Sequence, residues 1–369
     1  MPVEIADWND LDNVRNDLTG DYVLVNDLDE NTSGYDSVAS PTANDGQGFD
    51  PIGNEEFGEE VFTGSFDGQG NAIYDLTIDR SGRRLIAMFA KATNIQNLNV
   101  LDANINVDHE DNTHAILAAS SPSTSEPEMN LENCTVSGSI TVVGGGERVG
   151  GLVGQLFDAE TDAGTIQNCV SHVDVTSVGD EVGGLVGRNG DTVTESYATG
   201  SVEGTDGVGG LVGQNQETVT ESYATGSVEG TDEVGGLVGN SFGTETDSYW
   251  DTEATGQSTS DGDGTGLTTA EMQGSEAETN MDGFDFANTW DSVLESDDDT
   301  TADGYPILSV VDREQQLDSQ GVSTLIAFTI SALVNSESVE IQNIFAQVND
   351  EVREVTEAFA LINGSVEQI

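Results

Sequence analysis

Arg148 and Arg188 are the side chains whose sequence context is best suited to chemistry. Each stands beside a glycine-rich motif, and a carbohydrate-active β-helix enzyme would combine such basic groups with clustered aspartates that act as acid and base. With 69 Asp and Glu residues in the chain, however, neighbouring carboxylates arise by chance, and neither arginine recurs with a matched carboxylate cluster. No serine nucleophile motif, Cys–His pair or phosphate-binding loop is recognisable. We therefore predict solvated turn charges and no enzymatic activity, with a polysaccharide-degrading enzyme as the alternative.

Metal-binding residue types are sparse outside this acidic background. His109 and His114 flank the acidic segment 110–112, but their spacing outside a helix is poor for a metal site, and His172 stands apart. The segment 261–266, Asp-Gly-Asp-Gly-Thr-Gly, resembles the start of a calcium loop. A complete loop needs a bidentate glutamate where this chain has Ala270. We predict no metal site and no cofactor, with calcium at this segment left open.

The net charge defines the setting in which such a chain can fold. Asp and Glu outnumber Lys and Arg by 69 to 9, which gives a net charge of -60, and Lys91 is the single lysine. Self-repulsion of this size opposes compaction, and molar salt removes most of it by shortening the screening length to about 3 Å. Apolar residues recur regularly, unlike in disordered acidic chains. We therefore predict a folded halophilic protein that binds neither nucleic acid nor anionic membranes.

Four copies of Val-Gly-Gly-Leu-Val-Gly organise the middle of the chain. They start at Val149, Val182, Val208 and Val234, so the last two steps are 26 residues each. This period suits one turn of a solenoid, and each repeat is predicted to contain two short strands with glycines where backbones approach closely. The predicted structural repeat positions are Gly151, Leu152, Val153, Gly154, Gly184, Leu185, Val186, Gly187, Gly210, Leu211, Val212, Gly213, Gly236, Leu237, Val238 and Gly239.

A second set of equivalent positions lies between the glycine motifs. Parallel coils place equivalent side chains about 4.8 Å apart, so these residues are predicted to form one stacking ladder. Cys134 and Cys169 would then be one coil apart, where either a disulfide or two buried thiols fits. The predicted ladder consists of Leu98, Cys134, Cys169, Tyr197, Tyr223 and Tyr249.

These patterns predict a mainly β protein, a right-handed parallel β-helix with a short N-terminal capping helix. Asp7 is the expected N-cap, and Trp8, Leu11, Val14 and Leu18 mark one helical face, before a first strand at 22–25. We predict an N-terminal cap with the first coils at 1–82 and the repeats at 83–255. A C-terminal cap of the solenoid follows at 256–310, and a linker with an oligomerising helix at 311–369.

The glycine motifs, together with the entry segment 20–24 and the exit segments 248–272 and 304–308, resemble the GLUG-motif repeat family. The resemblance covers about residues 5–308. It implies a parallel β-helix of the kind found in large bacterial and archaeal surface proteins. The acidity makes the chain look like a haloarchaeal or haloarchaeal-virus version.

Beyond the glycine repeats, the C-terminus has apolar residues spaced alternately by four and three. This heptad pattern predicts a coiled coil, and β-branched residues at position d favour a homotrimer. A single amphipathic helix packed on the rod is the alternative. The predicted oligomerisation residues are Ile341, Phe345, Val348, Val352, Val355, Phe359, Ile362, Val366 and Ile369.

Taken together, these features predict a non-enzymatic, surface-exposed fibre or attachment protein. Residues 1–5 lack the start of a signal peptide, and no apolar run has membrane-spanning length, so membrane insertion is not expected. A virion part needs no export, which favours a tail-fibre-like component of a haloarchaeal virus or prophage that binds the host surface. The alternative is a secreted or wall-bound adhesin. The expected location is extracellular or on the virion surface, and the expected partner is a cell-surface glycan or glycoprotein.

Overall fold

The computed structural model describes residues 1–53, 60–80, 82–108, 113–122, 128–145, 147–157, 164–294, 304–311 and 316. C-terminal to these it describes only the backbone of four short strands between 345 and 368. The chain divides into two compact units, Met1–Thr324 and Leu325–Ile369.

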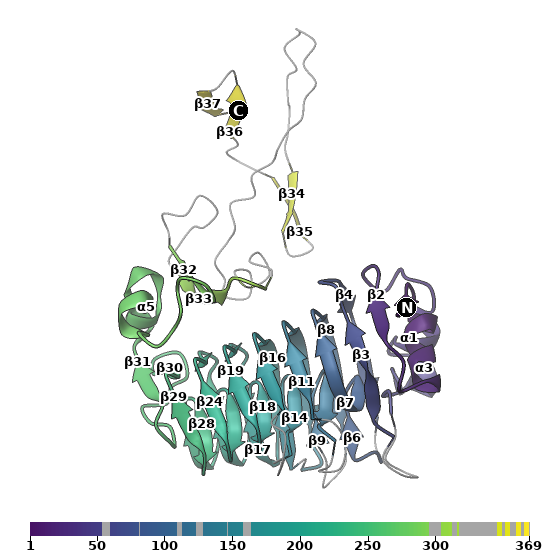
Figure 1. Ribbon diagram of the computed structural model, residues 1–369, viewed down its shortest axis with the longest axis horizontal. Coiled ribbons are helices and arrows are strands. Elements are labelled where there is room, and N and C mark those ends of the chain that lie inside the picture. The colour runs from purple at the N-terminus through teal and green to yellow at the C-terminus, as the bar shows by residue number, and fades with distance from the viewer. Residues whose placement is uncertain are drawn as a thin grey trace. The chain divides into compact units, whose positions relative to one another are not determined.

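The first unit is a parallel β-helix, which confirms the predicted mainly β solenoid (Figure 1). Its described strands form three long sheets whose strands come from successive coils. The first sheet contains β1 (Val3–Ile5), β2 (Tyr22–Leu24), β3 (Phe62–Asp67), β7 (Phe89–Gln96), β10 (Ala118–Ser120), β11 (Asn130–Glu132), β14 (Val153–Gln155), β15 (Thr165–Gln167), β18 (Val186–Asn189), β19 (Thr192–Thr194), β23 (Val212–Asn215), β24 (Thr218–Thr220), β28 (Val238–Ser241) and β29 (Thr244–Thr246).

The second and third sheets complete the wall of the solenoid. The second contains β4 (Ala72–Tyr74), β5 (Thr77–Asp79), β8 (Asn99–Val107), β12 (Thr135–Val142), β16 (Val170–Ser177), β20 (Tyr197–Ala198), β21 (Val202–Glu203), β25 (Tyr223–Ala224), β26 (Val228–Glu229), β30 (Tyr249–Asp251) and β31 (Thr265–Leu267). The third contains β6 (Leu85–Ile86), β9 (Thr113–His114), β13 (Arg148–Gly150), β17 (Asp180–Gly183), β22 (Asp206–Gly209) and β27 (Asp232–Gly235).

One 26-residue coil contains more strands than the sequence predicted. Residues 192–217 form β19, β20, β21, β22 and β23, five strands rather than two, because corners interrupt each predicted strand. The register follows the repeat: Val182 pairs with Val208 and Val208 with Val234. Identical side chains therefore stack along the rod, as the 26-residue period required.

The glycine motif forms the tight corner between the third and first sheets. A Cβ atom at Gly209 would lie 2.0 Å from the carbonyl oxygen of Val212 across the corner, and one at Gly210 would lie 2.3 Å from the carbonyl oxygen of Gly236 in the next coil. Leu211 is fully buried between them. The prediction that these glycines permit close backbone approach is confirmed, since any side chain there would meet main-chain atoms.

The N-terminal end carries the predicted helical cap. Helix α1 (Trp8–Asn13) begins after Asp7, whose carboxylate accepts hydrogen bonds from the backbone N–H groups of Asn9 and Asp10. The 3₁₀ helix η1 (Val14–Asn16), α2 (Tyr35–Val38) and α3 (Ala43–Gly46) follow. The first strand is not at 22–25 as predicted, because β1 precedes α1 and pairs in parallel with β2.

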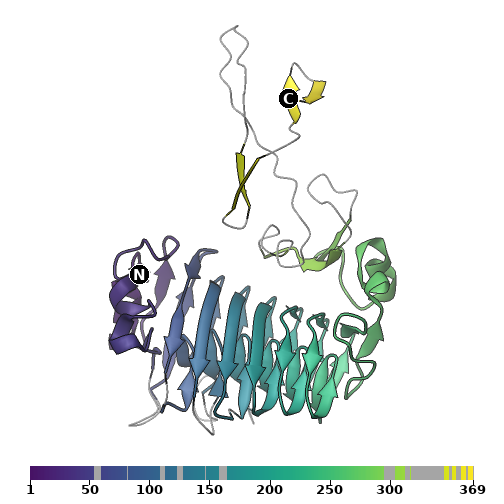
Figure 2. The same ribbon diagram turned by 180° about the vertical axis from the view of Figure 1, so that it is seen from behind.

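After the last coil, the chain folds back along the flank of the rod. This return segment contains α4 (Thr269–Met272), α5 (Gly274–Asn280) and an antiparallel pair, β32 (Trp290–Val293) and β33 (Gly304–Leu308) (Figure 2). Thr268 and Glu271 form a capping box at the start of α4. We call residues 269–311 the flank segment.

The prediction of a C-terminal coiled coil is wrong where the backbone is described, because strands are found there instead of a helix. Phe345 and Val348 lie in β34 (Phe345–Val348), which forms an antiparallel hairpin with β35 (Glu351–Glu354), where Val352 lies. The other hairpin joins β36 (Phe359–Ile362), which includes Phe359 and Ile362, to β37 (Ser365–Gln368), which includes Val366. Ile341, Val355 and Ile369 lie outside the described residues. The sequence between β36 and β37 is Asn-Gly, a strong hairpin signal that the apolar spacing had obscured.

Candidate functional site

The predicted stacking ladder is in fact two ladders that face opposite ways. Strand pairing places Val170 beside Tyr197, so Cys169 falls beside Ser196 rather than beside Tyr197. The predicted alignment was therefore one residue out between these two coils. Because successive side chains of a strand alternate between faces, that slip reverses the direction of the tyrosines. Leu98, Cys134 and Cys169 belong to the hydrophobic core of the rod, whereas Val170 and the tyrosines belong to a separate cluster with the flank segment.

Tyr197, Tyr223 and Tyr249 do stack in one ladder, as predicted. The rings of Tyr197 and Tyr223 are parallel within 4°, with centroids 4.7 Å apart. Trp290 of the flank segment packs against both rings, at 6.1 and 5.7 Å. The Tyr223 hydroxyl donates a hydrogen bond to the carbonyl oxygen of Pro306 at 2.6 Å. The ladder is therefore a docking strip for the flank segment and is not open to a ligand.

The two cysteines are buried free thiols in the core. Each Sγ lies 3.8 Å from a backbone carbonyl oxygen of the preceding coil, that of Ile95 for Cys134 and that of Leu131 for Cys169. Burial raises the pKa of the Cys169 thiol well above its ordinary value, and the neighbouring Cys134 raises it further. Thiols held in the protonated form in this way fill space and are poor nucleophiles.

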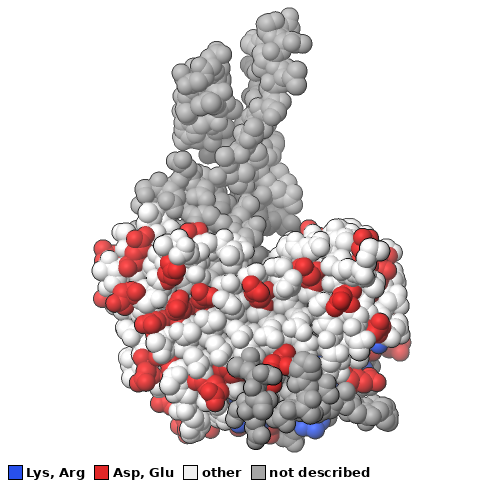
Figure 3. Space-filling view, viewed as in Figure 1, with Lys and Arg blue, Asp and Glu red and all other residues white. Residues whose placement is uncertain are grey.

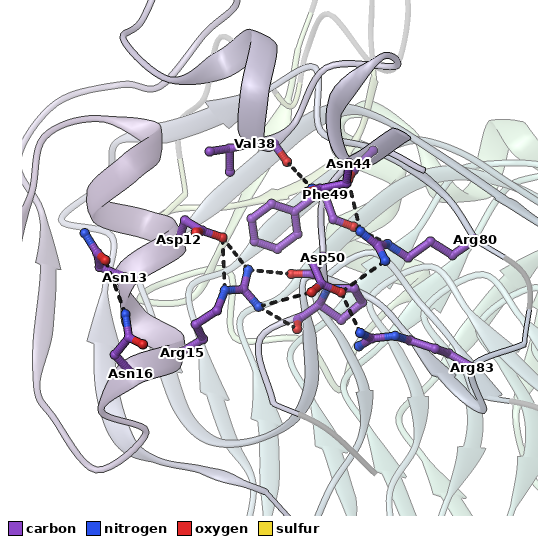
Figure 4. A network of polar contacts seen from close by, with 12 residues as sticks. Asp12, Asn13, Arg15, Asn16, Val38, Asn44, Phe49, Asp50, Arg80 and Arg83 are labelled. Carbon is purple, nitrogen blue, oxygen red and sulfur yellow. Dashed lines mark hydrogen bonds and ion pairs between the residues drawn. The ribbon is translucent and has the colours of Figure 1, made fainter. Parts of the chain in front are cut away.

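Basic side chains are so few that their positions are informative. Three arginines converge on one carboxylate, Asp50, beside the N-terminal cap (Figure 4). Arg83 lies 2.8 Å from Asp50, Arg80 lies 3.2 Å from it, and Arg15 of η1 also binds Asp12 at 2.6 Å.

The same arginines also donate to the backbone of the loop that precedes the first coils. Arg15 donates to the carbonyl oxygens of Asp50 and Pro51, and Arg80 donates to those of Gly48 and Phe49. Burial lowers the pKa of Arg80, whereas the charge of Asp50 raises it. This cluster ties the cap to the first coils, so its role is structural.

Four other basic residues line a single cavity on the wall of the rod. The cavity has a volume of about 370 Å³ and lies beside the corner between the third and first sheets. We call it the basic cavity. Its lining residues are Arg84, Leu85, Lys91, Thr113, Ser120, Arg148, Gln155, Phe157 and Arg188.

Strand register explains how residues far apart in sequence reach this cavity. Lys91, Ser120, Gln155 and Arg188 occupy paired positions on β7, β10, β14 and β18. On the neighbouring sheet Thr113 pairs with both Leu85 and Arg148. The cavity is therefore formed by two adjoining sheets whose outward positions carry cations and small polar groups.

The basic cavity differs from the rest of the described surface. Acidic residues are spread over the face in Figure 3, and the few basic atoms appear at its right side and along its lower edge, where β6, β9 and β17 lie in Figure 1. No carboxylate lines the cavity among the described residues. Arg148 is held by Glu181 at 2.9 Å and by Glu147 at 3.1 Å. Burial raises the pKa of Glu181, and the charges of Arg148 and Arg188 oppose that rise.

Arg148 and Arg188 were candidates from the sequence, whereas Arg84 and Lys91 were not. The two arginines were predicted to be solvated turn charges, and the structure brings them to one cavity. The sequence did contain a signal for Lys91 and Arg188, because the two residues occupy the same repeat position. Arg188 stands two residues after Val186 of a glycine motif, and Lys91 stands two residues after Phe89 of a degenerate copy. Arg84 carries no comparable repeat signal.

The candidate metal residues do not come together in the described part of the chain. No group of three or more His, Cys, Asp and Glu side chains is close enough there to hold an ion. In the segment proposed for calcium, Asp261 accepts a hydrogen bond from the backbone N–H of Ser241, and the N–H of Asp263 donates to Glu245. Burial lowers the pKa of His172 to about 4. His109 lies outside the described residues.

Comparison with known proteins supports the repeat assignment. The GLUG motif family matches residues 145–176, 180–203 and 204–229, so the chain carries GLUG repeats, as the resemblance implied. Halomucin from Haloquadratum walsbyi (strain DSM 16790 / HBSQ001) is 35% identical over 153 residues, which are 41% of this chain and 2% of halomucin. This chain thus spans a very small part of that relative.

A solved structure shares the fold. The crystal structure of a "putative immunoglobulin A1 protease" from Bacteroides ovatus superimposes with a TM-score of 0.61 at 20% identity, over 84% of this chain and 93% of that one. At this identity the likeness concerns architecture alone. Among the residues that the structure describes, no helix has the length and apolarity of a membrane span.

Proposed function

We propose that this chain, a carrier of GLUG repeats, is a surface-exposed attachment protein of a haloarchaeal setting and is not an enzyme. The observation that supports this proposal is the regular rod itself. Its coils repeat in register, its N-terminal end is covered by helices, and acidic side chains far outnumber basic ones on the face in Figure 3. Such a rod holds an outward-facing site at a fixed distance from its ends, which is what attachment requires.

The lining of the basic cavity argues against catalysis on polysaccharides. Glycoside cleavage and lyase chemistry need positioned carboxylates or another base beside the basic groups. The described lining offers arginine, lysine, threonine, serine and glutamine but no carboxylate. Glu181, the nearest acidic partner of Arg148, is engaged in an ion pair.

In its most specific form, the proposal is a tail-fibre-like virion component of a haloarchaeal virus or prophage. A wall-bound adhesin is the second candidate, and the similarity to halomucin of a haloarchaeon favours it. We further propose that residues 325–369 make the protein a homo-oligomer. Isolated two-stranded hairpins such as β34–β35 are marginally stable and gain from pairing with copies.

The experiment that tests attachment is binding of the fluorescently labelled full-length protein to haloarchaeal cells in molar KCl. Saturable binding that unlabelled protein competes away is the expected result. Absence of binding to a panel of such cells would contradict the proposal, and so would release of reducing ends from their envelope polysaccharides. Mass spectrometry of purified virions and of cell envelopes then distinguishes the fibre from the adhesin.

A further inference from the structure

We propose that the basic cavity binds an acidic saccharide, a short stretch of sugar chain that carries two or more carboxylate or sulfate groups. This inference deepens the proposed attachment function, because it names the surface chemistry that the rod would recognise. It rests on the residues that line the cavity, on their spacing along the rod and on the salt in which the protein folds.

The composition of the lining is the first argument. The chain has 9 basic residues among 69 acidic ones, yet four of the 9 line this one cavity and no described acidic residue does. Solubility in salt does not explain why basic residues gather in this cavity, because the acidic surface already provides that solubility. Three of the four are arginines, whose planar guanidinium groups match carboxylate and sulfate oxygens through paired hydrogen bonds.

The spacing of the cations is the second argument. Lys91 and Arg188 occupy the same ladder of the first sheet, separated by the coils of Ser120 and Gln155. Three steps of about 4.8 Å place their backbones about 14 Å apart, too far for one small anion to bridge. An extended ligand with an acidic group at each end fits this separation. Ser120 and Gln155 lie between them in the ladder.

The shape and remaining lining fit a sugar chain. A volume of about 370 Å³ falls within the usual range for ligand pockets, about 300–1,000 Å³. Phe157 and Leu85 supply apolar surface for the faces of sugar rings. The residues Ser120, Thr113 and Gln155 are only 1%, 5% and 6% exposed, so packing holds the wall between the cations in place before a ligand binds.

Electrostatics in high salt favour this ligand over nucleic acid. At molar salt the screening length is about 3 Å, so the net charge of -60 no longer repels an anion at a distance, while contact pairs persist. Nucleic acid binding depends on many phosphate contacts and falls steeply as salt rises. A compact cavity lined by four basic side chains suits a few well-placed acidic groups instead.

The test is calorimetric titration of the full-length protein in molar KCl with three probes. These are an oligogalacturonate, a sulfated galactan oligosaccharide and the corresponding neutral galactan oligosaccharide. We expect at least one acidic probe to bind and the neutral one not to bind, and the two acidic arms separate carboxylate from sulfate recognition.

Two variants assign binding to the cavity. Arg188→Gln introduces the residue already found at the paired positions Gln155 and Gln214, so the coil should fold unchanged. Lys91→Gln tests the other end of the ladder. We expect each variant to weaken binding about tenfold, about 1.4 kcal/mol. Glu229→Gln, on β26 of the second sheet, alters the net charge by one unit in the opposite direction, away from the cavity, and should leave affinity unchanged.

Several results would overturn the inference. They are equal binding of the neutral probe, unchanged affinity in both variants, or tight binding of a DNA oligonucleotide in molar KCl. Self-association that Arg188→Gln abolishes would also overturn it, by assigning the cavity to a contact between copies. Cell binding that survives both substitutions would refute the inference and leave the attachment proposal standing. Saccharide binding without cell binding would do the reverse.

Discussion

Replacing Tyr223 by alanine should detach the flank segment from the rod. The Tyr223 side chain is fully buried, stacks on Tyr197 at 4.7 Å and packs against Trp290 at 5.7 Å. Its hydroxyl donates to the carbonyl oxygen of Pro306 at 2.6 Å. Tyr223 is therefore the central contact between the β-helix and the segment that returns along it.

The magnitude follows from the contacts that are lost. A buried aromatic ring removes about 150–250 Å² from water, worth about 4–6 kcal/mol at about 25 cal/mol per Å². Measured truncations of buried aromatic residues to alanine cost about 3–5 kcal/mol. We therefore expect Tyr223→Ala to lower the free energy of unfolding by about 4 kcal/mol. Tyr223→Phe keeps the ring and loses only the hydrogen bond to Pro306, so it should cost about 1 kcal/mol.

The assay is urea unfolding in molar KCl, followed by tryptophan fluorescence and by far-ultraviolet circular dichroism. Of the three tryptophans, Trp290 alone lies in the flank segment, fully buried beside Tyr223, so a step in the emission that Tyr223→Ala shifts reports on docking of that segment. The strand signal reports on the rod. In Tyr223→Ala the fluorescence transition should move to lower urea ahead of the strand transition, because the flank segment separates first.

A matched control is Val178→Ala, since Val178 is 57% exposed and should tolerate truncation within about 0.5 kcal/mol. Equal costs for Tyr223→Ala and Tyr223→Phe would show that ring packing contributes little. An unchanged midpoint in Tyr223→Ala would refute the docking role altogether.

Further expectations concern salt, acid, the glycine corner and assembly. Circular dichroism during a KCl titration should show loss of the strand signal toward about 0.1 M, where the screening length grows to about 10 Å and exposes the net charge of -60; a constant signal would contradict this. Burial lowers the pKa of His172 from 6.5 to about 4, so as pH falls the unfolded chain protonates this imidazole before the folded chain does. Stability is full above pH 6.5 and should fall toward pH 4 by up to about 3 kcal/mol relative to His172→Gln, measured by urea unfolding. The pKa of Asp191 is raised to about 6 by burial, an effect of opposite sign that both proteins share and the comparison removes. Gly209→Ala would place a Cβ 2.0 Å from the Val212 carbonyl oxygen and should destabilise the coil by several kcal/mol in urea unfolding. It should cost more than Gly256→Ala, where no atom is near and only the left-handed backbone, with a φ of +71°, costs a side chain about 1–2 kcal/mol. Light scattering in molar KCl should show an oligomer for the full chain and a monomer for a truncation ending at Thr324; a monomeric full chain would refute the assembly proposal.

The repeat register was predictable because identical coils leave no ambiguity. Val182, Val208 and Val234 recur at equal intervals of 26 residues, and strand pairing places them side by side. Where the interval changes, the pattern alone is insufficient. Between Cys169 and Tyr197 two alignments differ by one residue, and only the packing of the opposite face distinguishes them. A phenol hydroxyl in the core would need a polar partner, which Tyr223 finds instead at Pro306 of the flank segment.

The C-terminal prediction failed because one apolar pattern admits two structures. Residues alternately four and three apart suit a coiled coil, yet β-branched and aromatic residues also favour strands. The hairpin β36–β37 pairs Ile362 with Ser365, with only Asn363 and Gly364 between them in sequence. Turn chemistry of that kind outweighs apolar spacing in short segments.

The basic cavity could be predicted only in part, because its residues come from coils separated by up to 104 positions, from Arg84 to Arg188. Each coil contributes one or two side chains, so no local stretch of sequence has the composition of a site. Strand pairing in the first sheet places residues from successive coils in one row, with Lys91 at one end and Arg188 at the other. Solenoids form sites in this way whenever one outward position changes chemistry from coil to coil.

The same logic explains why tyrosine appears at one outward position only in the later coils. Along the second sheet that position is Asn99, then Thr135, then Val170, and then Tyr197 and its two successors. The change from polar to apolar follows the footprint of the flank segment, whose buried residues Met272, Phe284 and Trp290 cluster with the tyrosines and Val170. An outward ladder that turns aromatic therefore marks the coils that another segment covers. The ladder that carries Lys91 at one end and Arg188 at the other is, by contrast, where we propose that a ligand from outside the chain binds.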